Sequence, residues 1–536
     1  DSVSDAASAS DSAPPPGKVD ESRSSVNNEG VPRPFRSPLV VFATPLCVAF
    51  LWACVYDSAV GQPVPASSAE GSEAAVDERD TGAVETREGT DASDGDDESV
   101  DDIRAADDDV VRSAPRVRHS RPEGHTLGVD IAIEDRDGSS MRALHAALRR
   151  AERGEGQARL VFYGASHVAS DLFTGVVRSR LQARFGDAGH GFVMPVAPWR
   201  SYRHQGVRIR GDEGGWESAK VRGDTRDIER FGLHGVFVET ARRNAWAEVS
   251  TTSSGDVGRA ASVFELFYYR QPRGGDLQVF LDGRPLERIR TRATDAGAGY
   301  ARYEVPDGPH SLRVRAHGNG LVRLFGLALE RERPGVIVDT LGINGARARY
   351  HLMWEDQLYR EHLRRRNPDL VVLAYGTNES GDDQPIALYE AQLRQVVTRV
   401  RETVPNASCL LVGPSDRPTR LEDGSYEDRP RTAQLIQAQH RVAVEMGCGF
   451  FDLVAFMGGP LSMVTWAGAE PAYGSQDHVH FTRTGYERLG NVLLDALLEG
   501  FDPPGSTATP ATAALPSPAS DEDQSEALAL EDPSDS

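Results

Sequence analysis

Five short apolar runs alternate with segments of helical periodicity, and this alternation limits the folds open to the 536-residue chain. Such runs are typical of strands buried on both faces, and their alternation with helices requires a parallel sheet covered on both sides. We therefore expect a doubly wound, flavodoxin-like, three-layer α/β fold. The expected strands are 160–163, 336–341, 370–374, 408–412 and 450–453, and the helices that follow them are 172–185, 350–366, 386–404, 432–446 and 484–498.

A β-rich stretch interrupts this alternation between residues 191 and 334. It consists of short alternating runs separated by Gly, Pro, Asp and Asn, a pattern that predicts an inserted β-sandwich or jelly roll. Asp282-Gly283 suits a type I′ turn and predicts a hairpin over 277–286. The α/β body is then divided into 126–190 and 335–500, with a further strand expected at 129–134 and a helix at 141–153.

The acidity of the chain is concentrated in its end segments. Residues 70–110 contain 17 acidic and 3 basic residues and no aromatic one, and residues 501–536 contain 8 acidic residues and no basic one. These two segments account for the whole net charge of −22. We expect residues 1–37, 57–125 and 501–536 to be disordered because they cannot bury enough apolar surface. The near-neutral remainder offers no basic surface for nucleic acid.

Residues 38–56 form an apolar segment whose only polar side chain is Thr44. As a helix, 19 residues would measure about 28 Å, close to the hydrocarbon thickness of a bilayer. Arg33 and Arg36 precede the segment, so the positive-inside rule predicts a cytoplasmic N-terminus and an exported body. We expect a single-pass inner-membrane protein with its folded body in the periplasm; a lipoprotein site at Cys54 and a cleaved signal peptide are alternatives that also export the body.

The two cysteines of the body leave two interpretations open. Cys409 and Cys448 pair in an oxidising compartment or remain as two buried thiols. Neither has the spacing of a zinc site, and we expect no metal and no cofactor.

Four positions that follow predicted strands, or precede the last helix, carry the residue types that acyl transfer needs. Ser166 follows the first main strand, and Asp477 and His480 precede the last helix. Ser166 is the candidate nucleophile, His480 its general base, and Asp477 the carboxylate that orients the imidazole. Gly345 and Asn378 follow two further strands, and we expect the amides of Ser166 and Gly345 and the Asn378 side chain to form an oxyanion hole.

These positions resemble the SGNH/GDSL hydrolases, whose four sequence blocks carry Ser, Gly, Asn and Asp-x-x-His in this order. The matching segments are Gly164-Ala165-Ser166-His167, Gly342-Ile343-Asn344-Gly345, Gly376-Thr377-Asn378-Glu379 and Asp477-His478-Val479-His480. The β-rich insertion resembles that of periplasmic peptidoglycan O-acetylesterases. Ala165 replaces the family's usual aspartate, and Glu379 replaces its commoner aspartate.

The resemblance implies a metal-independent serine esterase that removes O-acetyl groups from an envelope polysaccharide, with peptidoglycan as the expected substrate. The same residues would also serve a lipid or thioester acyl hydrolase or an O-acyltransferase, and an inactive glycan-binding protein is a further alternative. Trp199 and Trp216 are candidate sugar contacts because they lie in loop-like sequence, and His167 is a third because it adjoins the serine.

Overall fold

The computed structural model describes residues 127–222, 230–255 and 257–501. The chain divides into two units, Asp1–Glu88 and Gly89–Ser536, and every described residue belongs to the second. The predictions for residues 1–126, including the membrane anchor at 38–56, and for residues 502–536 lie outside the described residues.

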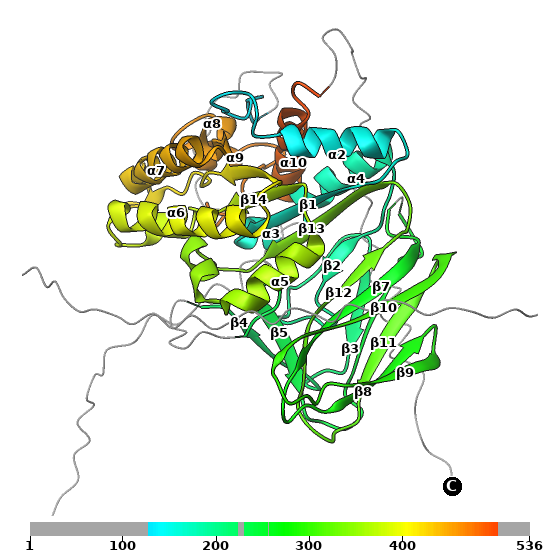
Figure 1. The fold of residues 1–536 in the computed structure, drawn as a ribbon. Helices are drawn as coiled ribbons and strands as arrows, with labels where there is room; N and C mark the ends of the chain where they lie inside the picture. Colours follow the sequence, from blue (N-terminus) through cyan, green and yellow to red (C-terminus); the bar gives the residue numbers. More distant parts are fainter. Residues whose placement is uncertain (1–126, 223–229, 256, 502–536) are drawn as a thin grey trace, which may run out of the picture. The chain divides into compact units, whose positions relative to one another are not determined.

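A five-stranded parallel sheet forms the centre of the α/β body (Figure 1). Its strands are β1 (Gln157–Gly164), β13 (Gly335–Gly342), β14 (Leu370–Ala374), β15 (Ser408–Val412) and β18 (Gly449–Phe451). Their order across the sheet is β13-β1-β14-β15-β18, so the first strand of the sheet lies between the second and the third. This is the flavodoxin-like order, and it confirms the predicted doubly wound sheet.

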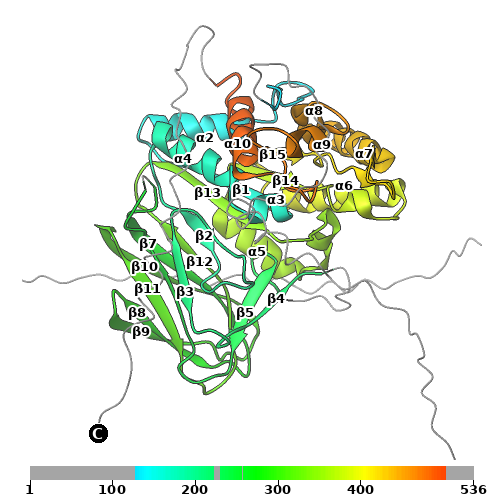
Figure 2. The same ribbon diagram turned by 180° about the vertical axis from the view of Figure 1, so that it is seen from behind.

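Alternating side chains of the strands face two different helix layers. Leu160 and Phe162 pack with α2 (Arg142–Glu152), α4 (Phe173–Phe185) and α10 (Arg483–Leu497). Val161 and Tyr163 pack in the cluster that contains α5 (Asp356–Arg366), α6 (Ile386–Thr403) and α7 (Pro430–Met446). Figures 1 and 2 show α2, α4 and α10 grouped together in both views. The strands are therefore apolar on both faces because both faces are buried.

The residues between α4 and β13 form two antiparallel sheets. One has the order β10-β7-β12-β5-β4, with β2 paired to β12, and the other has the order β3-β6-β11-β8-β9. We call residues 191–330 the β-rich segment. Its strands are β2 (Gly191–Val193), β3 (Arg208–Gly211), β4 (Glu217–Lys220), β5 (Val236–Thr240), β6 (Trp246–Ser250), β7 (Ala261–Arg270), β8 (Asp276–Leu281), β9 (Arg284–Arg290), β10 (Gly297–Gly308), β11 (Ser311–Ala316) and β12 (Val322–Glu330).

The hairpin predicted from Asp282-Gly283 joins β8 and β9. Both turn residues have positive φ, +48° at Asp282 and +74° at Gly283, as a type I′ turn requires. This prediction is confirmed.

The β-rich segment is joined to the α/β body by buried charges. Glu330, the last residue of β12, accepts hydrogen bonds from Arg159 of β1 at 2.6 and 3.1 Å and forms an ion pair with Arg366 of α5 at 2.6 Å. Arg366 also binds Asp339 of β13, and Asp339 accepts a hydrogen bond from the Phe192 amide of β2. These contacts fix β2 and β12 to β1, β13 and α5.

Two predicted elements and one boundary were wrong. Residues 129–134 form no strand; Glu134 alone makes an isolated bridge to Phe450. The helix predicted over 350–366 is instead a 3₁₀ helix (Ala348–Met353) followed by α5, because the Glu355 side chain caps a new helix by accepting from the amides of Gln357 and Leu358. The predicted acidic tail begins one residue too early, because Phe501 is buried against helices α2 and α4.

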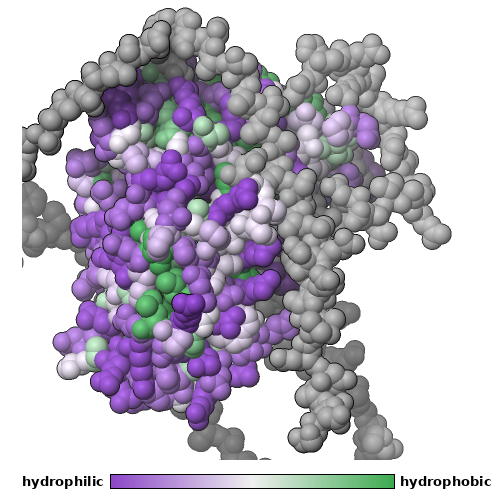
Figure 3. Space-filling model, turned by 90° about the vertical axis from the view of Figure 1, so that its right-hand side faces the viewer, coloured by the Kyte–Doolittle hydropathy of each residue, from purple (hydrophilic) through white to green (hydrophobic). Residues whose placement is uncertain are grey.

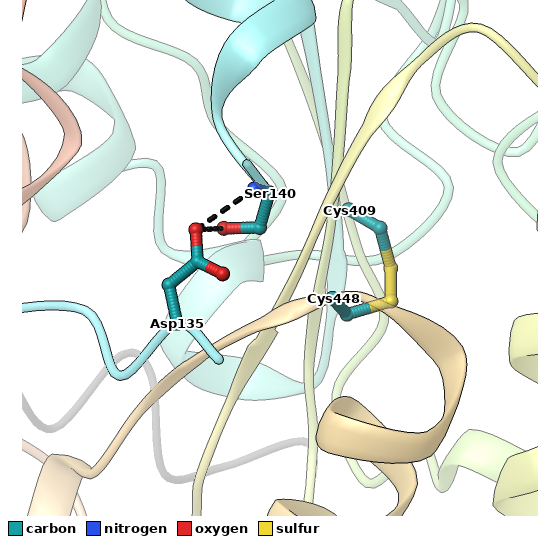
Figure 4. The surroundings of a disulfide bond; sticks show 4 residues. All are labelled: Asp135, Ser140, Cys409 and Cys448. Carbon is teal, nitrogen blue, oxygen red and sulfur yellow. Dashed lines mark hydrogen bonds between the residues drawn. A yellow bond between two sulfur atoms is a disulfide. The ribbon is translucent and has the colours of Figure 1, made fainter. Parts of the chain in front are cut away.

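Cys409 of β15 and Cys448, the residue before β18, form a disulfide with Cα atoms 4.7 Å apart (Figure 4). The same figure shows Asp135, whose carboxylate accepts from the amide and hydroxyl of Ser140 just before α2. Of the two interpretations of the cysteines, the structure has the bonded pair.

The face drawn in Figure 3 is mostly hydrophilic, with a small group of apolar residues near its middle. Within the described part of the chain, no helix has both the length and the apolar character needed to cross a bilayer.

Candidate active site

Ser166 lies directly after β1, at the first position of the short helix α3 (Ser166–Ala169). The turn is tight: a Cβ at Gly164 would lie 2.3 Å from the Val168 side chain and 2.9 Å from the Ala374 carbonyl oxygen. Only glycine fits at this crossing, which explains why the apolar run stops there. Ser166 is 8% exposed, and its amide is among the first N–H groups of α3, which have no intrahelical acceptor.

Ser166, His480 and Asp477 form a continuous hydrogen-bonded chain. His480 Nε2 lies 2.8 Å from Ser166 Oγ, and His480 Nδ1 lies 2.6 Å from Asp477 Oδ2. The other carboxylate oxygen of Asp477 accepts from the amides of Val479 and His480 at 2.8 and 3.0 Å. Burial acts to raise the pKa of Asp477, but the hydrogen bonds from His480 outweigh it and hold this pKa well below its usual range. The carboxylate is therefore ionised, as needed to orient a neutral imidazole and stabilise its protonated form.

The loop that carries this chain of contacts turns sharply at His478, whose φ is +57°. The His478 ring stacks on Tyr426 of the β16–β17 hairpin (Thr419–Arg420 and Tyr426–Glu427), with ring centroids 4.4 Å apart. The left-handed conformation of His478 reverses the direction of the chain. The side chains of Asp477 and His480, three positions apart, can therefore contact each other. The fixed ring of His478 supports this turn.

The predicted oxyanion-hole residues follow the neighbouring strands β13 and β14. Gly345 has φ +74°, a backbone conformation that favours glycine. The Asn378 side chain donates one hydrogen bond to the Ala346 carbonyl at 3.0 Å, and its Nδ2 group carries a second N–H. Since β1 lies between β13 and β14, Ser166, Gly345 and Asn378 follow three adjacent strands at the carboxyl edge of the sheet. The strand order reverses between β1 and β14, which is where open α/β sheets bind ligands.

His167 is 8% exposed, as is Ser166, and its ring contacts protein groups on several sides. Its Nδ1 lies 2.9 Å from the Tyr486 hydroxyl and its Nε2 3.1 Å from Ser415 Oγ, and its ring packs on Phe481. Burial lowers the pKa of His167 to about 3, with a further contribution from nearby His480, so the ring is neutral near pH 7. Both ring nitrogens are already within hydrogen-bond distance of protein groups, and the role of His167 as a substrate contact stays a prediction.

The two tryptophans predicted to contact sugar are half-buried against the core of the β-rich segment. Trp216 donates from Nε1 to the Trp246 carbonyl at 2.9 Å. Trp199 lies 6.2 Å, centroid to centroid, from His234, whose Nε2 lies 2.8 Å from the carbonyl oxygen of Gly342 at the end of β13. His234 therefore connects Trp199 to the end of β13, just before the loop that carries Gly345. The role of Trp199 as a sugar contact stays a prediction.

Sequence reasoning missed the residues that connect the site to the rest of the protein. His234 and Ser415 are far from the four blocks along the chain, and Tyr486 lies in the helix after the last block; no spacing or periodicity distinguishes them. Only the fold brings them together. Among residues 127–222, 230–255 and 257–501, no group of three or more His, Cys, Asp or Glu side chains is arranged to hold a metal ion.

The comparisons with known proteins agree with this geometry. The model of the GDSL-like lipase/acylhydrolase family matches residues 298–488, a range that contains Gly345, Asn378, Asp477 and His480. No curated protein matches the chain in sequence. A solved structure of a peptidoglycan O-acetylesterase is 24% identical, covers 69% of this chain and 99% of its own, and has a TM-score of 0.58, which shows a shared fold.

More distant matches include two family two carbohydrate esterases. The one from Cellvibrio japonicus covers 55% of this chain and 98% of its own, and the one from Clostridium thermocellum covers 49% and 95%. Both are 12% identical with TM-scores of 0.23, too low to add to the assignment.

The fold and the family match identify this protein as a carboxylic ester hydrolase. Within that class, residues 298–488 match the GDSL-like lipase/acylhydrolase family.

Proposed function

We propose that this protein is a serine esterase that hydrolyses O-acetyl esters on an envelope polysaccharide, with peptidoglycan as its substrate. The observation that carries the proposal is the hydrogen-bonded chain from Ser166 through His480 to Asp477 at the carboxyl edge of the sheet. The named activity of the structurally similar peptidoglycan O-acetylesterase supports the choice of substrate. The match to an acylhydrolase family model supports the reaction type.

In the proposed first step, Ser166 Oγ attacks the acetyl carbonyl carbon while His480 Nε2 accepts the hydroxyl proton. The negative charge that develops on the carbonyl oxygen is stabilised by the amides of Ser166 and Gly345 and by the free N–H of Asn378 Nδ2. Asp477 stabilises the imidazolium. The C–O bond to the sugar then breaks, and His480 returns the proton to the departing sugar oxygen, which leaves an acetyl-Ser166 intermediate.

In the second step a water molecule attacks the acetyl carbonyl, and His480 takes one of its protons. The bond to Ser166 Oγ breaks, Oγ recovers the proton from His480, and acetate leaves. The enzyme is regenerated, and one ester bond and one water molecule are consumed in each turnover.

We also propose that the body is exported. The Cys409–Cys448 disulfide supports this location, because such bonds form and persist in oxidising compartments and are rare in the cytosol. An exported body is also what the apolar segment at 38–56 predicts, and it would give the esterase access to the cell envelope.

Acetate release from O-acetylated peptidoglycan by the full chain tests the proposal. We expect Ser166→Ala to lower kcat by about 10⁴-fold or more, because the residual rate comes from binding and the oxyanion hole alone. Ser179→Ala is the matched control: this α4 hydroxyl donates only to the Val176 carbonyl, and its loss should leave the rate unchanged. Full activity in Ser166→Ala would exclude Ser166 as the nucleophile, and faster turnover of an octanoate ester than of acetate would favour a lipid or thioester substrate.

A further inference from the structure

The two loops that carry Gly345 and Asn378 are tied together by one buried carboxylate. Glu379 begins the short 3₁₀ helix Glu379–Gly381 after β14, and it is 4% exposed. Its Oε1 accepts from the amide of Ala348 at 2.8 Å, in the loop after β13. Its Oε2 accepts from the amide of Gly376 at 3.0 Å, in its own loop. One side chain therefore spans the two loops that adjoin the candidate nucleophile.

Two further side chains, Asn378 and Arg347, join the loop after β13 to the loop after β14. Asn378 Nδ2 donates to the Ala346 carbonyl at 3.0 Å. Arg347 binds Asp382 through Nη2 at 2.7 Å and Nε at 2.9 Å, and it donates from Nη1 to the Gly345 carbonyl at 2.8 Å. The contacts of Glu379 with Ala348, of Asn378 with Ala346 and of Arg347 with Asp382 hold the segment 345–348 against the segment 376–382. Of these side chains, Glu379 is the one whose two oxygens both accept from backbone amides.

The arrangement suits a carboxylate: burial raises the pKa of Glu379 above its usual value, and the hydrogen bonds from backbone amides act against this rise. Both Glu379 oxygens face N–H donors, so each must act as an acceptor. A glutamine of the same shape has one acceptor oxygen, and its NH₂ group would oppose the second backbone N–H. An aspartate keeps both acceptors but is one methylene shorter, so it would lose reach toward Ala348 or Gly376.

We propose that Glu379 is a positioning residue for the oxyanion hole: by joining the loops after β13 and β14, it holds the Gly345 amide and the Asn378 side chain where the developing oxyanion will lie. This inference rests on the proposed roles of Gly345 and Asn378. Because oxyanion contacts strengthen in the transition state, a misplaced donor lowers kcat more than it raises KM. A purely structural carboxylate would lower stability without this selective effect.

The test compares full-length variants on p-nitrophenyl acetate, an ester that uses the oxyanion hole whatever the natural acyl donor is. We expect Glu379→Gln to lower kcat by about 10²-fold with KM within a few-fold of the wild type, and Glu379→Asp to recover part of that loss. If Glu379→Gln does not fold, Arg347→Gln provides a milder change, with an expected loss in kcat of about 10-fold. The melting temperature of each variant is recorded in parallel.

Asp369→Asn is the matched control. Asp369 is a partly buried carboxylate, 22% exposed and paired with Arg150, that also accepts from a backbone amide, that of Arg159 at 2.9 Å, but it precedes β14 at the opposite edge of the sheet. We expect this variant to lose stability and to keep the wild-type kcat.

Three outcomes would overturn the inference: a wild-type kcat in folded Glu379→Gln, a loss confined to KM, or an equal loss of kcat in Asp369→Asn. Activity on p-nitrophenyl acetate without acetate release from peptidoglycan would reject only the proposed substrate. Unchanged hydrolysis of p-nitrophenyl acetate by Ser166→Ala would reject the proposed function and this inference together.

Discussion

Asp171 fixes the chain just after the candidate nucleophile. It has φ +52°, is fully buried, and binds Arg178 at 2.6 and 3.1 Å, while the Thr174 and Thr340 hydroxyls also donate to it. The chain has Ala165 where SGNH/GDSL hydrolases usually have aspartate, and Asp171 provides a buried carboxylate five residues after Ser166. The segment between α3 and α4 is thereby fixed without an acidic residue at position 165.

We expect Asp171→Asn to lower the free energy of unfolding by about 3–5 kcal/mol, because it leaves Arg178 buried without a charged partner. Burial acts to raise the pKa of Asp171, but Arg178 outweighs it and holds the pKa well below its usual range. The stabilisation by the ionised carboxylate is therefore complete above about pH 4 and falls as the pH drops toward the folded-state pKa. Urea titrations between pH 2 and 7 measure both effects.

Asp130→Asn is the control for this prediction, because Asp130 pairs with Arg488 while its side chain is 83% exposed. Such a surface pair should contribute little to stability. Equal losses in the two variants would contradict the role assigned to Asp171.

At the scale of elements, the short strand β18 depends on the disulfide beside it. Only three residues, Gly449–Phe451, form β18; β15 is the one strand that it pairs with in the parallel sheet, and on its other side Phe450 bridges to Glu134. Cys409 and Cys448 join the two strands where their pairing begins, at Leu410 and Gly449. The covalent link compensates for the few hydrogen bonds that so short a strand can make.

We expect reduction of the disulfide to destabilise the protein by about 4 kcal/mol, the chain-entropy contribution of a loop closed over 39 residues. For a body of this size, the melting temperature should fall by roughly 5 °C. Calorimetry of the wild type with and without dithiothreitol measures the change. The double variant Cys409→Ala/Cys448→Ala should melt near the reduced wild type and should not respond to dithiothreitol; a reductant-insensitive wild type would contradict the prediction.

At the scale of the whole described body, the β-rich segment and the parallel sheet share a continuous apolar core. Phe192 of β2, Phe267 of β7 and Leu341 of β13 belong to the same cluster of buried residues. The charges of Glu330, Arg159, Arg366 and Asp339 lie across the same boundary. A boundary with this much burial predicts that the two parts unfold together.

We expect Glu330→Gln to lower the free energy of unfolding by about 3–5 kcal/mol, because two arginines lose their shared carboxylate. We also expect the wild type to melt in one calorimetric transition and the variant to melt earlier, also in one transition. Glu304→Gln is the control, since this glutamate pairs with Arg302 at an exposed surface. Two separate transitions in the wild type would show that the β-rich segment folds on its own.

Much of the α/β body could be predicted from the sequence because its signals are local. An apolar run that stops at a glycine predicts a buried strand and a tight turn, and both were found at β1, β13 and β14. Because parallel strands present their carboxyl ends at one edge, residues that follow different strands could be expected to meet there. The contacts between His480, Ser166 and Asp477 follow from this geometry.

Contacts between distant segments could not be predicted in this way. The burial of His167 depends on Tyr486 and Ser415, which are hundreds of residues away along the chain, and Phe501 is buried because it reaches back to α2 and α4. The helix break at Trp354 follows from a cap by Glu355 that competes with a continuous helical pattern. The bridge from Glu379 to Ala348 likewise has no signal in composition or periodicity.

The sequence by itself determined the strands, the helices and the residue types at the edge of the sheet, since hydrophobic periodicity and turn chemistry act over a few residues. The tertiary structure alone decided the order of the strands, the pairing of Cys409 with Cys448, and which polar groups face one another across β13, β1 and β14. The physical reason is that these contacts close long loops, and their energy depends on burial and geometry that no local segment possesses.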